Sequence, residues 1–266
     1  MKAIFIVLII ALVGLFVIWR LPVSEQSTNN TDTTVPEANT EQIPLTSSMR
    51  VYFEDTAGYF VRPDDEVNYP GVVMIHEWWG LNEHIKREAE NLAQEGYQVL
   101  AVDLYDGEVA ETPDRARELS SGINQARATE NLRAATTFLR REDAPKVASL
   151  GWCFGGGQSL NVALSGESLD ATVIYYGRLN TNPGELGRME WPVLGIFGAE
   201  DTSIPVATVR EFEEALGEAG VPNEIHVYDG VGHAFANPSG DNYARSETQD
   251  AWQKTLTFLR NSLKQE

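Results

Sequence analysis

The sequence is poor in cysteine and in basic residues, and each scarcity argues against a class of protein. A single cysteine among 266 residues allows no intramolecular disulfide, so an oxidising compartment would be tolerated but not exploited. The 20 Lys and Arg side chains face 39 Asp and Glu side chains, which gives a formal net charge of −19. Because phosphate binding needs clustered basic side chains, this charge argues against nucleic acid as a partner and against adsorption to anionic lipid.

Histidine is also scarce, and its positions give no metal pattern. The chain has four histidines, and no two histidines or acids show the spacing of metal ligands. We therefore expect no metal and no cofactor. His84 falls on a predicted helix and His226 inside a predicted strand, which indicates structural or surface groups. His233 differs, because it stands in a glycine-rich loop after a strand, where functional side chains concentrate.

One long apolar run is present, at the start of the chain. Ala3 to Trp19 comprises 17 residues without a charge, between Lys2 and Arg20. That length is short for a bilayer span of about 17–25 residues and long for a signal-peptide core of about 7–15. We predict an N-terminal transmembrane signal anchor over residues 1–21, with a cleaved signal peptide as the alternative. The flanking charges favour an N-terminus inside, so the following domain is expected to be membrane-anchored outside the cytoplasm, or exported.

The composition changes after this run. Ser24 to Ser48 is rich in Thr, Asn, Ser, Glu and Pro and almost free of large apolar residues. Such a segment buries too little apolar surface to pack. We predict a disordered polar linker over residues 22–48, followed by one folded domain over residues 49–266.

Strand and helix patterns alternate along the domain. An opening hairpin is expected at Met49 to Phe53 and Tyr59 to Val61. Amphipathic helical patterns separate the later apolar runs. Those runs predict strands at Gly71 to Ile75, Tyr97 to Asp103, Lys146 to Leu150, Ala171 to Tyr176, Pro192 to Phe197 and Glu224 to Tyr228. This alternation predicts an α/β fold, with a mostly parallel sheet and helices on both faces.

The single cysteine lies at a special place in this pattern. Gly151-Trp152-Cys153-Phe154-Gly155 connects a predicted strand to a predicted helix, which is the elbow that exposes a nucleophile in α/β-hydrolases. The flanking glycines allow strand and helix to pack closely around a strained turn. Ser159 is a weaker candidate, since it lacks the second glycine and falls inside the helix. The pattern favours Cys153 as a sulfur nucleophile over an inert buried thiol.

Two partners for the cysteine follow later strands. A thiol needs a base to take its proton, and an imidazole needs a carboxylate to fix its tautomer. Asp201 and His233 follow the strand ends at Phe197-Gly198 and Tyr228, in the chain order nucleophile, acid, histidine. Glu200 is an alternative for the acid, and Asp201 alone would also fit a helix cap.

Five ordered motifs resemble one known family. They are His76-Glu77-Trp78-Trp79-Gly80-Leu81-Asn82, Asp103-Leu104-Tyr105, Gly151-Trp152-Cys153-Phe154-Gly155-Gly156, Gly198-Ala199-Glu200-Asp201 and Gly232-His233-Ala234-Phe235. From about Val51 to Leu263 the chain resembles the dienelactone hydrolase (carboxymethylenebutenolidase) family. The resemblance implies an α/β-hydrolase fold and a carboxylic ester hydrolase that forms a thioester acyl-enzyme. It makes Cys153 the nucleophile, His233 the general base and Asp201 its orienting acid.

The resemblance also assigns roles to residues beside the nucleophile. It implies that Glu77 gates the thiol, contacting it at rest and moving as substrate arrives. The expected oxyanion hole consists of the backbone N–H groups of Trp78 and Phe154. Trp78 is also expected to wall an apolar pocket, whereas ordinary packing is preferred for Trp79.

Two positions depart from the family pattern. Members that cleave dienelactone carry arginines for its carboxylate where this chain has Gly107 and Asn237, and Asp106 adds an acid. We therefore expect an uncharged small-molecule ester or lactone as substrate. Two other classes stay open: a non-catalytic ligand-binding domain on a hydrolase scaffold, and a thiol redox or sulfur-transfer protein. The absence of a second, resolving cysteine counts against the redox class.

Overall fold

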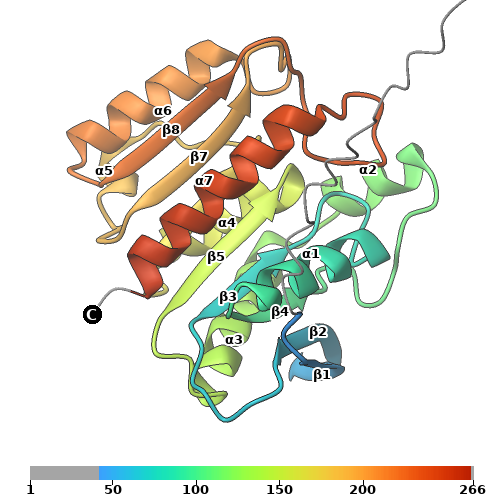
Figure 1. The fold of residues 1–266 in the computed structure, drawn as a ribbon. Helices are drawn as coiled ribbons and strands as arrows, with labels where there is room; N and C mark the ends of the chain where they lie inside the picture. Colours follow the sequence, from blue (N-terminus) through green and yellow to red (C-terminus); the bar gives the residue numbers. More distant parts are fainter. Residues whose placement is uncertain (1–41, 265–266) are drawn as a thin grey trace, which may run out of the picture. The chain divides into compact units, whose positions relative to one another are not determined.

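The central element of the structure is an eight-stranded sheet in the order β1-β2-β4-β3-β5-β6-β7-β8. The structure is a computed structural model that describes residues 42–264 (Figure 1). Its strands are β1 (Leu45–Phe53), β2 (Thr56–Pro63), β3 (Gly71–Ile75), β4 (Gln98–Val102), β5 (Val147–Trp152), β6 (Ala171–Tyr175), β7 (Val193–Gly198) and β8 (Asn223–Tyr228). β1 and β2 pair antiparallel, and β3 to β8 pair in parallel. The prediction of a mostly parallel sheet is confirmed.

Helices cover both faces of this sheet, as the alternation predicted (Figure 1). They are α1 (Glu83–Gln94), α2 (Pro113–Ser121), α3 (Gln125–Arg141), α4 (Phe154–Leu164), α5 (Pro183–Leu186), α6 (Val206–Glu218) and α7 (Arg245–Leu263). α3, α4 and α6 pack into one hydrophobic core, and α1 and α7 pack into the other. The short helix α5 did not show in the sequence pattern, because four residues carry no periodicity.

The strand side chains explain why two cores form. In β3, Val73 and Ile75 belong to the core of α3 and α4, whereas Val72 and Met74 belong to the core of α1 and α7. Successive side chains of a strand point to opposite faces, so a continuous apolar run supplies both layers at once. This is why the central strands show apolar runs rather than alternation.

The N-terminal boundary of the domain differs from the prediction. β1 begins at Leu45, where Leu45 pairs with Pro63 of β2, so residues 45–48 belong to the sheet and not to the predicted linker. Thr46, Ser47 and Ser48 are exposed because β1 is an edge strand, and this polar surface made them look like linker. The predicted anchor and the linker up to residue 41 lie outside the described residues. Within 42–264, no helix is long and apolar enough to cross a bilayer.

Close backbone packing surrounds the turn between β5 and α4. A Cβ at Gly155 would lie 2.4 Å from the carbonyl oxygen of Ile75 and 2.5 Å from that of His76. A Cβ at Gly151 would lie 2.2 Å from the carbonyl oxygen of Gly155. These neighbours are backbone atoms that cannot rotate away, so both positions require glycine.

We expect Gly155→Ala to lower the free energy of unfolding by about 3 kcal/mol or more, because the added methyl group overlaps the end of β3. Urea denaturation followed by circular dichroism measures this. Gly217→Ala is the matched control: it lies in α6, its Cβ would meet nothing within 4 Å, and alanine in a helix should stabilise by about 0.5–1 kcal/mol. Equal stability of the two variants would contradict the packing argument.

Candidate active site

Cys153 occupies the tip of the turn that joins β5 to α4. Its backbone has φ 53° and ψ −115°, a left-handed conformation that is uncommon for a residue with a Cβ. The Cys153 N–H donates a hydrogen bond to the Tyr175 carbonyl oxygen at 2.9 Å, which ties the turn to β6. The side chain is half-buried. The local geometry therefore has the strained, projecting form of a nucleophile elbow.

The turns after β7 and β8 bring two further side chains to the same edge of the sheet. His233 Nε2 lies 3.1 Å from Cys153 Sγ, and His233 Nδ1 lies 2.7 Å from Asp201 Oδ2. The carboxyl ends of parallel strands meet at one edge, so three residues far apart in the sequence form one continuous line. The line runs from sulfur through imidazole to carboxylate.

The acid in this line is Asp201. Its Oδ1 accepts hydrogen bonds from the N–H groups of Ser203 at 2.7 Å and Ile204 at 3.0 Å, which fixes the carboxylate while Oδ2 faces His233. Burial favours the neutral form, but the hydrogen bonds from His233 and these N–H groups outweigh it and lower the pKa of Asp201. Glu200, the alternative acid, is exposed, and within residues 42–264 the carboxylate bonded to the imidazole is that of Asp201.

Ser159, the rival nucleophile, is not near this line. It is fully buried, and its hydroxyl donates to the Ser149 hydroxyl at 2.8 Å inside the core. A buried hydroxyl without a neighbouring base is not activated as a nucleophile. Ser159 therefore has a packing role in the contact between α4 and β5.

The surroundings of His233 favour the protonated, positively charged form of its imidazole. Burial alone would lower the pKa of the imidazole, but hydrogen bonds with Asp201 and Cys153 and the charges of both partners raise it to about 10. His233 therefore lies between a carboxylate and a sulfur, with one ring nitrogen directed at each.

Glu77 lies at the end of β3 but does not contact the thiol. It is 4 % exposed, and its Oε2 accepts a hydrogen bond from Nδ2 of Asn237. Within residues 42–264, no hydrogen bond joins Glu77 to Cys153, whose sulfur faces His233 instead. Burial raises the pKa of Glu77 to about 7, although Asn237 and the charge of His233 act in the opposite direction. The contact implied at rest is thus not present in this arrangement.

Two buried residues, Asn237 and His76, orient Glu77, and the sequence did not predict these contacts. The Oδ1 of Asn237 accepts the Ser239 N–H at 2.8 Å, so its amide nitrogen must face Glu77. His76 Nε2 accepts the Leu104 N–H at 3.2 Å, and its Nδ1 donates to the Glu77 carbonyl oxygen at 2.5 Å. These partners fix one neutral tautomer. The sequence signal for His76 was its position at the end of a buried strand.

The two N–H groups predicted as an oxyanion hole have no acceptor within the described part of the chain. Phe154 is the first residue of α4, so its N–H has no intrahelical partner. Trp78 lies in the loop between β3 and α1, and its N–H donates to no protein atom among residues 42–264. An α-helix N-terminus also carries a partial positive charge. Among residues 42–264, both N–H groups are therefore left without a backbone acceptor.

Aromatic rings pack near the line of side chains formed by Cys153, His233 and Asp201. The Tyr176 ring lies edge-on to the His233 ring, with centroids 5.3 Å apart, and Tyr176 also has a positive φ of 35°. Trp78 and Trp79 meet edge-to-face at 5.2 Å and are both half-buried. Tyr176 was not identified from the sequence, where it reads as the last residue of a strand. Its position beside His233 restricts the imidazole to one plane.

The two positions at which members that cleave dienelactone carry arginines hold neutral residues in this chain, Gly107 and Asn237. Gly107 has φ 92°, and a Cβ added there would meet no atom within 4 Å. The side chain of Asn237 faces Glu77. The neighbouring acid Asp106 is paired with Arg127 at 3.0 Å, so its charge is compensated. The centre consequently offers a buried carboxyl group and no arginine or lysine at these two positions.

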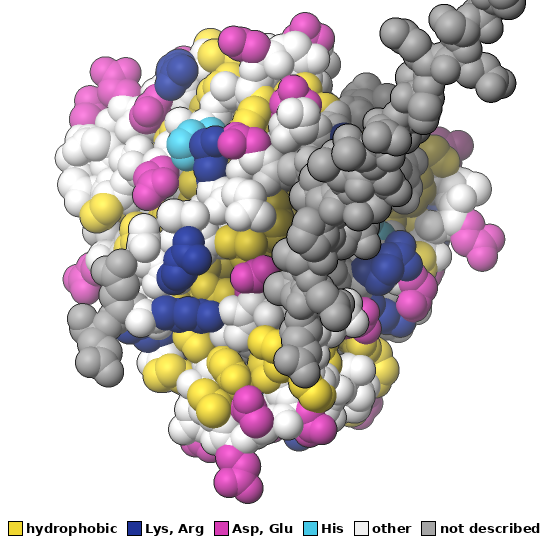
Figure 2. Space-filling model, viewed as in Figure 1, with side chains coloured by type: hydrophobic (Ala, Val, Ile, Leu, Met, Phe, Trp, Pro, Cys, Tyr) yellow, Lys and Arg dark blue, Asp and Glu magenta, His cyan; other side chains and the backbone are white. Residues whose placement is uncertain are grey.

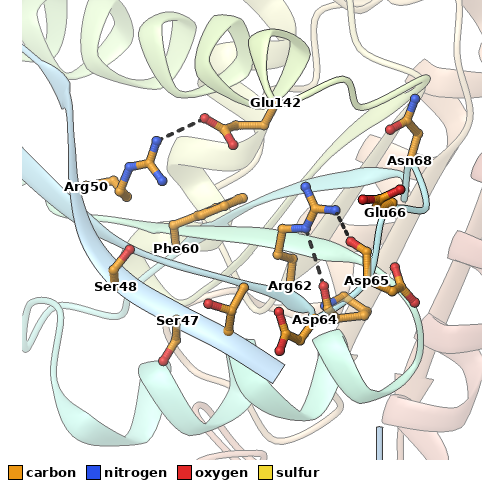
Figure 3. Close-up of a pocket in the computed structure, with 12 residues that line it drawn as sticks. Ser47, Ser48, Arg50, Phe60, Arg62, Asp64, Asp65, Glu66, Asn68 and Glu142 are labelled. Atoms are coloured by element: carbon orange, nitrogen blue, oxygen red, sulfur yellow. Dashed lines mark hydrogen bonds and ion pairs between the residues drawn. The ribbon is translucent and has the colours of Figure 1, made fainter. Parts of the chain in front are cut away.

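One cavity among the described residues lies away from the line of Cys153, His233 and Asp201. Its volume is about 440 Å³, between the β1–β2 hairpin and the end of α3. Figure 3 shows Arg50 paired with Glu142 and Arg62 bonded to backbone oxygen on its walls. Its lining contains serines but no histidine. In residues 42–264 no group of three His, Cys, Asp or Glu side chains could hold a metal ion.

The fold and the site together define an α/β-hydrolase with a cysteine at the nucleophile elbow. The family model described as "Dienelactone hydrolase family" matches residues 56–263. The chain therefore belongs to the dienelactone hydrolase family, which confirms the predicted family and fold class.

Similar proteins agree with this assignment. The chain is 32% identical over 219 residues to "Protein usf" of Aquifex pyrophilus, covering 77% of this chain and 93% of that protein. It is 29% identical to a Methylorubrum extorquens protein provisionally named a carboxymethylenebutenolidase, covering 90% and 86% of the two chains. A dienelactone hydrolase-like promiscuous phosphotriesterase from metagenomic libraries matches with TM-score 0.74 and 26% identity, covering 82% and 98%.

We expect Glu77→Gln to stabilise the protein above pH 7. The folded state binds the Glu77 proton more tightly than the unfolded chain, with a pKa raised from 4.5 to about 7, so stability is lost as pH rises through this range. One pKa unit corresponds to about 1.4 kcal/mol, which predicts a gain of about 3 kcal/mol for the uncharged variant at pH 8. Urea unfolding between pH 4.5 and 8 should show this gap closing at the acid end; a constant gap would contradict the burial argument.

Proposed function

We propose that this hydrolase cleaves carboxylic ester or lactone bonds through Cys153, His233 and Asp201. The observation that carries the proposal is the continuous line from Sγ to Nε2 at 3.1 Å and from Nδ1 to Oδ2 at 2.7 Å. The same elements, nucleophile, base and orienting acid, are what acyl transfer requires. Family membership supports hydrolysis as the reaction class.

In the first half of the reaction, the Cys153 thiolate attacks the carbonyl carbon. The carbonyl oxygen gains negative charge and accepts hydrogen bonds from the N–H groups of Trp78 and Phe154. The bond to the leaving oxygen then breaks, and His233 donates its proton to that oxygen. The products are a thioester on Cys153 and an alcohol, or, from a lactone, an acyl chain that ends in the new hydroxyl.

In the second half, water replaces the alcohol. His233, now neutral, accepts a proton from the water as its oxygen attacks the thioester carbonyl. The carbon–sulfur bond breaks, which releases the carboxylic acid and restores the thiolate beside a protonated His233. Asp201 stabilises the imidazolium throughout and keeps Nε2 directed at the reacting atoms.

The environment of the site supports an uncharged substrate. A substrate carboxylate would approach Glu77 without a basic partner, because Asn237 and Gly107 are neutral and Asp106 is already paired with Arg127. Like charges in a site of low dielectric repel strongly. For the cellular location, we propose a domain tethered by residues 1–21 outside the cytoplasm, based on the apolar run and its flanking charges.

Hydrolysis of p-nitrophenyl acetate tests the proposed nucleophile and base. We expect Cys153→Ala and His233→Ala each to lower kcat/KM by about 10³-fold or more, and Asp201→Asn to lower it by about 10²–10⁴-fold because the imidazole loses its orientation. The release of p-nitrophenolate gives the rate directly.

The matched control is His226→Ala, which removes a histidine that lies in β8 and contacts Glu224 of the same strand. This variant should leave kcat/KM within about twofold. Unchanged activity in Cys153→Ala would refute the proposal. Saturable binding of esters without any turnover in the unaltered protein would favour a ligand-binding domain instead.

Charge selectivity tests the proposed substrate class. We expect kcat/KM for p-nitrophenyl acetate to exceed that for mono-p-nitrophenyl succinate, whose acyl chain ends in a carboxylate, by about tenfold or more at pH 8. Part of this preference should disappear in Glu77→Gln, because the repelling charge is removed. Equal rates for both esters in the unaltered protein would contradict an uncharged substrate.

A further inference from the structure

A second, smaller cavity lies between α1 and α7, on the face of the sheet seen in Figures 1 and 2. Its volume is about 50 Å³, enough for a few non-hydrogen atoms. It is lined by His84 and Glu88 of α1, Trp152 of β5, Tyr175 of β6, Thr248 and Trp252 of α7, and Ala236. Neither the proposed hydrolysis nor the motifs account for this group of side chains.

Three aromatic rings form part of the cavity wall. Trp152 and Tyr175 are buried, with ring centroids 5.6 Å apart, and Trp252 is half-buried. The face of an aromatic ring attracts a cation within about 6 Å, and tryptophan does so best. Within residues 42–264, no Lys or Arg side chain is stacked on any of these three rings.

A carboxylate without a strong cationic partner completes the wall. Glu88 Oε1 lies 3.7 Å from His84 Nδ1, and Glu88 Oε2 accepts a long hydrogen bond of 3.4 Å from Asn91. Burial lowers the pKa of His84 and raises that of Glu88, so the imidazole is a poor counter-ion at neutral pH. Among the described residues, no Lys or Arg forms an ion pair with Glu88 within 4 Å. A partly buried carboxylate in this state is stabilised by a cation.

The lining selects among classes of ligand. An anion is disfavoured, because no Lys or Arg lines the cavity. A metal cation of the hard type needs about six oxygen ligands, whereas the lining supplies one carboxylate, from Glu88, and few other side-chain oxygens, among them the Thr248 hydroxyl. A neutral apolar molecule would leave the carboxylate without a counter-charge. An organic cation matches both the rings and the carboxylate.

We propose that this cavity binds a small alkylammonium ion, whose nitrogen pairs with Glu88 while its methyl groups contact Trp152, Tyr175 and Trp252. The site is separate from the line of Cys153, His233 and Asp201. It adjoins both catalytic turns, because Trp152 precedes the nucleophile and Ala236 follows His233 by three residues.

Isothermal titration calorimetry of the full chain with methylammonium chloride tests the proposal. We expect saturable binding with a Kd of about 1–10 mM, the strength of one ion pair with a few cation–π contacts. Methanol, a neutral analogue of similar size, should not bind, and potassium chloride should produce no saturable signal. Binding of potassium equal to that of methylammonium would overturn the proposal in favour of a simple counter-ion site.

Matched variants identify the residues responsible. Glu88→Gln should weaken methylammonium binding by about tenfold or more, whereas Glu83→Gln should leave it unchanged, because Glu83 lies on the same helix but is exposed and paired with Lys86. Equal affinity of these two variants would overturn the assignment.

The aromatic wall gives an independent result if Glu88→Gln does not fold, which circular dichroism would show. Trp252→Ala should weaken binding by about fivefold and Trp252→Phe by about twofold or less, since phenylalanine keeps a ring face. No saturable binding in the unaltered protein up to 100 mM, or full affinity in Trp252→Ala, would refute the site.

Discussion

The turn between β5 and α4 is the constraint on which the rest of the site depends. Gly155 packs against the backbone at the end of β3, and Gly151 packs against Gly155, so helix and strands approach more closely than any side chain permits. This packing holds Cys153 in a left-handed conformation, with its sulfur facing His233. The strain at one residue is balanced by contacts spread over β3, β5 and β6, which is how a folded protein maintains an unfavourable local conformation.

The ionisable side chains around this turn differ in their surroundings, and their pKa values shift in different directions. His233 is held as a cation between Asp201 and Cys153, whereas Glu77 is buried beside a neutral amide and binds its proton more tightly. Asp106 lies near the same edge but is compensated by Arg127. These environments separate a carboxylate that is charged beside an imidazole from one that can be neutral near pH 7, although both follow the ends of strands.

The elements of the sheet were predictable because their signals are local. Apolar runs such as Gly71 to Ile75, turn glycines and amphipathic helices depend on neighbours within a few residues. The predicted boundary between residues 48 and 49 was wrong for the same reason. The exposed edge strand at Thr46, Ser47 and Ser48 has no apolar signal, and its pairing with β2 is not encoded by adjacent residues. The residues around Glu77 were harder still, since Asn237 is 160 positions away.

The sequence by itself determined the class of fold, the family, the position of Cys153 at an elbow and the chain order of its candidate partners. These follow from patterns that a few adjacent residues carry. Only the tertiary structure decided that Asp201 rather than Glu200 faces His233, and that Glu77 bonds to Asn237 and not to the thiol. It also decided that Glu88 lines one cavity together with three aromatic rings from other elements. Such choices depend on the direction of each side chain after the sheet has formed, and no local pattern encodes that direction.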